Sequence, residues 1–153
     1  MKNRRSLAGV LAVLAAVLAV FAPTATAAPE GFRITREVPT LADLEEQVRF
    51  LVETAASDEA KAANLEGGMN AVVVPRTVYN LGLFRAPKGW NEVTGPETHS
   101  GDEHTAMLHT NSAGRPGIVM KVTWKRIDGV WKLANSSLCE GVKTVGLPIP
   151  CTF

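Results

Sequence analysis

The sequence predicts an α+β domain in which amino-terminal helices pack on a curved antiparallel sheet. Apolar residues recur at helical spacing between Thr40 and Phe84, and from Trp90 onward they alternate as in strands. Two cysteines near the end of the chain indicate an oxidising compartment. We therefore expect a single exported domain with helices first and a meander of strands afterwards.

Residues 1–27 have the features of a secretory signal peptide. Basic residues begin the segment, an uncharged aliphatic run over residues 7–22 follows, and small residues precede the expected cleavage after Ala27. A retained membrane anchor is the alternative, but the run is shorter than the roughly 20 apolar residues that span a bilayer. No later segment is long and apolar enough to span a membrane. We expect the protein outside the cell or in the cell envelope.

The signal segment also carries the positive charge of the chain. Of the 16 Lys and Arg, cleavage removes Lys2, Arg4 and Arg5, which leaves 13 against 15 Asp and Glu and a formal charge of −2. Without a basic excess, nucleic acid is not an expected partner. Residues 28–38 are expected to form an extended lead-in, and residues 39–153 one domain long enough to bury a real core.

Helix signals are clearest after Pro39. Thr40 followed by Asp43 matches a capping box. An apolar stripe at helical spacing comes next and predicts a helix that faces the core: Leu41, Leu44, Val48, Leu51 and Val52.

Two weaker helical segments are expected before the strands. A short alanine-rich helix over residues 57–65 should stop at Gly67-Gly68. An apolar run over residues 69–74 ends at Pro75, and apolar residues three apart from Arg76 to Phe84 predict another helical turn.

Four strands are expected after Trp90. The first lies within residues 91–98, and the second spans residues 105–110 after a polar turn. The last two follow residues 113–117, which are rich in Gly and Pro, and meet at Asp128-Gly129.

The final hairpin has a defined register. A two-residue turn at Asp128-Gly129 suits the twist of paired strands and places Trp124 opposite Leu133. One face then carries Ile118, Met120, Val122, Trp124, Trp131 and Leu133, and the other carries Lys121, Thr123, Lys125 and Lys132. Since a one-residue slip would expose every apolar side chain, the first face should lie against the helices. Arg126 is expected to stack on Trp131.

Cys139 and Cys151 are expected to form a disulfide, because an even pair in an exported chain usually does. The bridge is expected to close a short loop that follows the last strand, and such a closure stabilises a fold by about 3 kcal/mol. Without a CxxC motif the bridge is expected to be structural and not redox-active.

Three pieces of the chain resemble the actinobacterial low-molecular-weight secreted antigen family, C-terminal domain. Pro39-Thr40 opens the leucine-spaced helix, and Lys61 stands five residues before Glu66 in KAANLEGG. The segment VTWKRIDGVWKLANSSLC is similar to the family's closing hairpin. The resemblance covers about residues 39–151.

This resemblance implies secretion and a cone-shaped fold of the cystatin-like or nuclear-transport-factor-2-like type. It implies no catalytic residues, because the family is known as exported antigens without an established activity. The chain departs from the family at Asn64, where an aliphatic residue is usual. It also departs over residues 79–104, which are longer and richer in Gly and Pro than expected.

One polar cluster is the best place to look for chemistry: Glu97, His99, Asp102, Glu103, His104 and His109. The residues lack a recognised metal-ligand spacing, and in a strand His104 and His109 would point to opposite faces. We expect no metal and no cofactor, and interpret the cluster as a solvated turn. The alternative is an isomerase or dehydratase that uses His109 with Asp102 or Glu97 as an acid–base pair.

We expect a non-catalytic, antigen-like protein; if it has a ligand, the expected one is an apolar small molecule or a cell-envelope partner. The candidate pocket lies on the enclosed apolar face and comprises Tyr79, Phe84, Met120, Trp124 and Trp131. An ordinary filled core is the favoured interpretation of that face, because most apolar stripes merely pack. The outer lysines could meet an anionic envelope polymer, although a solvated strand face explains them as well.

Overall fold

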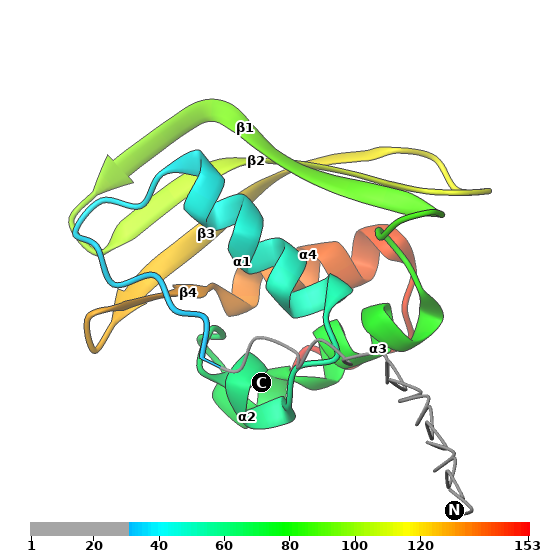
Figure 1. Cartoon of the computed structure of the whole chain (residues 1–153), viewed down its shortest axis with the longest axis horizontal. Coiled ribbons are helices and arrows are strands. Elements are labelled where there is room, and N and C mark those ends of the chain that lie inside the picture. Colours follow the sequence, from blue (N-terminus) through cyan, green and yellow to red (C-terminus); the bar gives the residue numbers. More distant parts are fainter. Residues whose placement is uncertain (1–30) are drawn as a thin grey trace, which may run out of the picture.

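The computed structural model describes residues 31–153, so the predicted signal segment and its cleavage site lie outside the described residues. The helices are α1 (Leu41–Glu53), α2 (Asp58–Ala62), the 3-10 turn η1 (Gly68–Ala71), α3 (Val73–Leu81) and α4 (Asn135–Val145). The strands are β1 (Gly89–Ser100), β2 (Glu103–Ser112), β3 (Ile118–Ile127) and β4 (Val130–Leu133). They form one antiparallel sheet in sequential order (Figure 1), which confirms the predicted α+β class.

The capping box predicted at the start of α1 is present. The Asp43 backbone N–H donates to the Thr40 hydroxyl at 3.2 Å, and the Thr40 backbone N–H donates to the Asp43 carboxylate at 2.8 Å. The helix lies across the sheet (Figure 1), and its buried Leu44 and Val48 belong to the same apolar cluster as Val93 of β1. The apolar stripe is therefore a core face.

The next helices differ from the prediction in extent. The short helix α2 is capped by the Ser57 hydroxyl and ends at Ala62. Pro75 is expected from the sequence to end the apolar run. It sits instead in the first turn of α3. Proline is tolerated there because the N–H groups of a first turn have no partner within the helix. The helix ends at Gly82, which has a φ of +66°. A glycine in this left-handed conformation is a common C-cap.

The register predicted for the last hairpin is confirmed. Trp124 pairs with Leu133 and Ile127 with Val130. Asp128 has a φ of +53° and Gly129 one of +77°, as the predicted mirror-image turn requires. Both indoles, of Trp124 and Trp131, are fully buried.

The ring of Trp131 meets histidines and not the arginine predicted to cover it. The His99 ring centroid lies 5.7 Å away, and that of His104 lies 6.1 Å away, both edge-on. Within residues 31–153, the cation–π contacts are instead those of Lys61 and Arg85 with Tyr79.

The strand β4 is too short to cover β3. It pairs with only Trp124 to Ile127, so the first six residues of β3 have no strand on that side. The chain turns away at Ala134 and forms α4, where the sequence had been interpreted as a loop; that expectation is wrong. The helix could have been recognised, because Leu138, Val142 and Val145 recur at helical spacing before Gly146.

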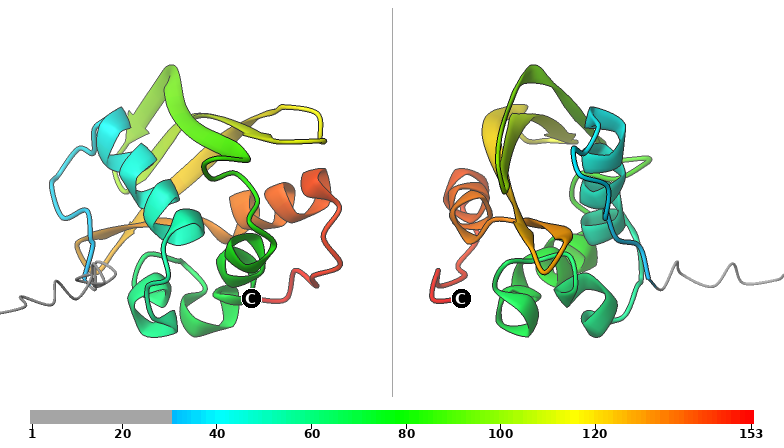
Figure 2. Two further views of the ribbon diagram at one scale, coloured as in Figure 1. Left: turned by 45° about the vertical axis from the view of Figure 1, so that its right-hand side comes forward. Right: turned by 90° about the vertical axis from the view of Figure 1, so that its left-hand side faces the viewer.

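Helix α4 takes the place of the missing strand. The Ala134 backbone N–H donates to the Thr123 carbonyl at 3.0 Å, and the Thr123 backbone N–H donates to the Ser137 hydroxyl at 2.8 Å. One side chain of α4 therefore satisfies a strand donor that β4 leaves unpaired. Viewed end-on, α1 and α4 lie on either side, with the sheet above and α2 and α3 below (Figure 2).

The Glu66-Gly67-Gly68 segment ties α2 to the start of α4. The Glu66 carboxylate accepts from the Asn135 backbone N–H at 2.8 Å and from Lys125 Nζ at 2.7 Å. A Cβ atom on Gly67 would come within 2.8 Å of Asn135 Oδ1, and Gly68 has a φ of +54°. The residues that carry the family resemblance here have a structural role.

Burial raises the pKa of Glu66, but the hydrogen bonds from Lys125 and Asn135 and the Lys125 charge outweigh it. The pKa of Glu66 is consequently lower than its ordinary value of 4.5. Such a carboxylate contributes stability that is complete above the unfolded-state pKa and is lost as the pH falls through the folded-state pKa.

Asn64, the departure from the family pattern, is the centre of a buried polar network. Its side-chain amide donates to the carbonyls of Phe32 at 2.9 Å and Ala60 at 3.1 Å. Asn64 Oδ1 accepts from Gln47 Nε2 at 2.9 Å, and Gln47 Nε2 also donates to the Trp131 carbonyl at 2.7 Å. The network joins α1, α2 and β4 to residues 31–36. Within that segment, Ile34 also forms an antiparallel β-bridge with Trp131.

Cys139 of α4 is disulfide-bonded to Cys151, as predicted. The segment after Gly146 folds back, and Asn135 Nδ2 donates to the Phe153 carbonyl at 2.8 Å. Leu147 and Ile149 of this segment pack against the core formed by α1, α3 and α4. The bridge therefore holds the end of the chain on the domain.

We predict that Ser137→Ala lowers the free energy of unfolding by about 1–3 kcal/mol, since it leaves the Thr123 N–H without an acceptor. The neighbouring Ser136 is exposed, so Ser136→Ala should change stability by less than about 0.5 kcal/mol. Urea denaturation of the two variants measures the difference. Equal stability of both would contradict the assigned role of Ser137.

We predict that Glu66→Gln costs roughly 1–2 kcal/mol at neutral pH, since the charge-assisted bonds are lost but the ion pair is partly exposed. The wild type should lose more stability than this variant as the pH falls below 4.5, the ordinary pKa of Glu66. Denaturant titrations at several pH values test this. Glu46→Gln, at an exposed position of α1, is the control and should keep the wild-type pH dependence.

Candidate functional site

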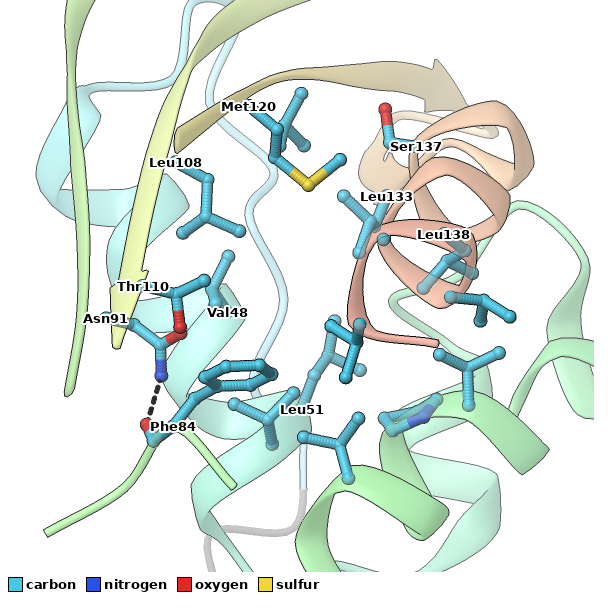
Figure 3. A pocket seen from close by; sticks show the side chains of 18 of the residues that line it. Val48, Leu51, Phe84, Asn91, Leu108, Thr110, Met120, Leu133, Ser137 and Leu138 are labelled. Carbon is cyan, nitrogen blue, oxygen red and sulfur yellow. Dashed lines mark hydrogen bonds between the residues drawn. The ribbon is translucent and has the colours of Figure 1, made fainter. Parts of the chain in front are cut away.

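This packing leaves an apolar cavity between α1 and α4. It has a volume of about 100 Å³. The inner face of β2 and β3 forms one wall, and α3 closes the side opposite to the sheet (Figure 3). The apolar lining comes from all these elements: Val48, Leu51, Val52, Val74, Pro75, Val78, Phe84, Leu108, Ile118, Met120, Val122, Leu133, Leu138, Gly141, Val142, Val145 and Leu147.

The remaining lining residues, Asn91, Thr110 and Ser137, use their polar groups within the protein. The Asn91 amide donates to the Phe84 carbonyl at 2.6 Å (Figure 3), and Thr110 Oγ1 donates to the Trp90 carbonyl at 3.3 Å. The Ser137 hydroxyl accepts from the strand as described above. None of the residues that line the cavity is an acid, a base or a thiol. Its chemistry is that of a dry apolar site.

Two of the five predicted pocket residues, Phe84 and Met120, line this cavity. Trp124 and Trp131 are fully buried farther along the sheet, in a cluster with α1. Tyr79 lies under the Lys61 ammonium, 4.8 Å from the ring centroid, and under the Arg85 guanidinium at 4.3 Å. The indole end of the interior is therefore a filled core, and the Met120 end is hollow.

A second, shallow hollow adjoins the cavity at the β2–β3 loop. It has a volume of about 360 Å³ and is formed by that loop and the last turn of α4. Ile118 and Val145 line both spaces. Arg115 lies at its rim and donates from Nη1 to the Val145 carbonyl at 3.1 Å.

The polar cluster singled out from the sequence does not converge on the cavity. His104 is buried on the core face, and its Nε2 lies 3.1 Å from Glu97 Oε2. His109 is on the outer face, as its separation from His104 predicts, and its Nε2 lies 2.9 Å from Thr94 Oγ1. In residues 31–153, no group of three His, Cys, Asp or Glu side chains is arranged to hold a metal ion.

The alternative catalytic pair, His109 and Asp102, is not brought together. Asp102 lies in the β1–β2 turn, where its carbonyl accepts from the Arg126 backbone N–H at 2.8 Å. His109 is seven residues farther along extended strand β2, on the order of 20 Å away.

Lys61, the lysine of the family resemblance, is a buried cation with a structural role. It is 3% exposed and donates to the Thr54 carbonyl at 2.9 Å, at the end of α1. Burial lowers the pKa of Lys61; the charge of Asp58 opposes the shift, and Arg76 and Arg85 add to it. The lysine joins the end of α1 to α2 and lies outside the cavity lining.

The outer lysines also differ from one another. Lys125 is bonded to Glu66, whereas Lys121 is exposed.

No helix within residues 31–153 is long and apolar enough to cross a bilayer.

Among curated proteins, none matches this chain. The family model described as "Low molecular weight antigen MTB12, C-terminal domain" matches residues 37–149. The match runs from just before α1 to the segment that folds back beyond α4, so it includes every element around the cavity. The chain thus belongs to the low molecular weight antigen MTB12 family, through its C-terminal domain.

Proposed function

We propose that the protein is a secreted, non-catalytic carrier that binds an apolar small molecule in the cavity between α1 and α4. The observation that carries this proposal is the composition of the lining. Apolar side chains surround the space, and the polar groups of Asn91, Thr110 and Ser137 are engaged by the protein. A ligand there would be held by apolar burial, at about 25 cal/mol per Å² removed from water.

The disulfide and the membership in an antigen family support secretion as the setting of this function. Disulfides persist in oxidising compartments, and Cys139–Cys151 anchors the segment that contributes Leu147 to the cavity. Binding rather than catalysis is favoured because acid–base chemistry needs a titratable group within hydrogen-bond reach of the substrate. The cavity lining offers none.

Gly141 provides a way to fill the cavity without harming the fold. It lies within α4 and lines the cavity, and a Cβ atom there would meet only Met120 Sδ at 3.9 Å. Gly141→Ala should stabilise the protein by about 0.5–1 kcal/mol, since glycine is unfavourable inside a helix. Gly141→Leu should keep the gain in helix propensity while its side chain occupies the space.

We predict that the wild type and Gly141→Ala bind dodecanol, and that Gly141→Leu binds it at least about tenfold more weakly, a loss of about 1.4 kcal/mol. Isothermal titration calorimetry measures the affinities, and thermal unfolding confirms that all three proteins fold. The proposal fails if the wild type does not bind dodecanol, or if Gly141→Leu binds it as well as Gly141→Ala. Mass spectrometry of protein purified from its native culture would identify a co-purifying lipid.

A further inference from the structure

The cavity adjoins an open hollow whose chemistry differs from that of its interior. The cavity and the adjoining hollow meet at Ile118 and Val145, which line both. The rim beyond them is formed by the β2–β3 loop and the end of α4: Arg115, Pro116, Gly117, Val119 and Thr144. Ile118 and Val145 therefore lie between the two spaces.

Arg115 places a positive charge at this opening. Its Nη1 donates to the Val145 carbonyl, one of the last carbonyls of α4, which have no partner within the helix. A guanidinium has five N–H donors in a planar fork, and this bond uses one of them. None of the ion pairs among residues 31–153 involves Arg115. The side chain is therefore positioned by the helix end and keeps donors for an anion.

No acidic side chain offsets the charge of Arg115, although an anion there has to overcome the partial negative charge of the carbonyls at the end of α4. Arg115 is the only charged residue that lines the hollow, and no acidic side chain is part of its rim. The Thr144 hydroxyl, also on the rim, is a second polar group that can donate to an oxyanion. Arginine binds carboxylates and phosphates with two parallel hydrogen bonds.

The size of the interior restricts the apolar part of the ligand. An apolar cavity of about 150 Å³ holds one benzene molecule. The cavity here, at about 100 Å³, is smaller. It suits the end of a single unbranched alkyl chain, with the rest of the chain in the adjoining hollow, and is too small for a fused ring system.

We propose that the ligand is a single-chain amphiphile with a terminal oxyanion. Its alkyl chain enters between Ile118 and Val145, and its head group binds the Arg115 guanidinium and the Thr144 hydroxyl. This inference rests on the proposed function, because it names the ligand class of the same cavity. The oxyanion is a carboxylate in a free fatty acid and a phosphate in a single-chain phospholipid.

The test compares three probes that share one chain: dodecanoate, dodecyl phosphate and dodecanol. Arg115→Gln removes the charge but retains an amide donor for the Val145 carbonyl. Lys143→Gln is the matched control, since Lys143 is an exposed cation on the last turn of α4 that lines neither space. Affinities are measured by isothermal titration calorimetry on the disulfide-bonded protein.

We expect Arg115→Gln to weaken binding of one or both anionic probes by roughly 10- to 100-fold, as for a lost charge-assisted hydrogen bond, and to leave dodecanol unchanged. Lys143→Gln should change each affinity by less than about twofold. The probe with the larger loss identifies carboxylate or phosphate as the head group. Dodecanol binding that Gly141→Leu abolishes, together with anion binding that is indifferent to Arg115→Gln, would overturn this inference and leave the proposed function standing. Binding of none of the probes would overturn both.

Discussion

The architecture depends on the length of β4. Because this strand pairs with only four residues of β3, the backbone of Ile118–Thr123 needs another partner along that edge. An unpaired strand edge leaves hydrogen-bonding groups exposed and invites pairing with other chains. Helix α4 covers the edge, with Ala134 and Ser137 supplying a backbone donor and a hydroxyl acceptor to Thr123. A helix cannot continue the strand ladder, so the side chains of α4 take over the contact with the sheet.

The cavity follows from that replacement. A longer β4 would have extended the sheet along β3, whereas α4 stands off the sheet and faces α1 across the interior (Figure 2). Side chains of modest size project from α4 into this space, and Gly141 projects none, so the space is not filled. Leu147 also lines the space, and it lies on the segment that the Cys139–Cys151 bond holds in place. The disulfide thus stabilises a wall of the site as well as the end of the chain.

Local features of the fold could be predicted from the sequence, and features set by tertiary packing could not. The capping box at Thr40 and the turn at Asp128-Gly129 depend on neighbouring residues, and both are present. Alternation assigned Met120 and Trp124 to the inner face, but it carries no information on which part of that face is filled. Asn64 departs from the family pattern, and its role could not be predicted because its partner Gln47 is seventeen residues away in sequence. The helix α4 was missed because the spacing of the cysteines suggested a loop.

The separation of charge from the interior determines how such a site can discriminate between ligands. Two buried titratable groups lie away from the cavity lining. His104 is hydrogen-bonded to the Glu97 carboxylate, and Lys61 to the Thr54 carbonyl. An apolar lining distinguishes ligands mainly by volume, since each methylene contributes about 0.8 kcal/mol whatever its parent molecule. For the proposed ligand, discrimination by chemical type would therefore have to arise where the lining ends, at Arg115 and Thr144. Fixing the guanidinium on the end of α4 before a ligand arrives lowers the entropy cost of using it.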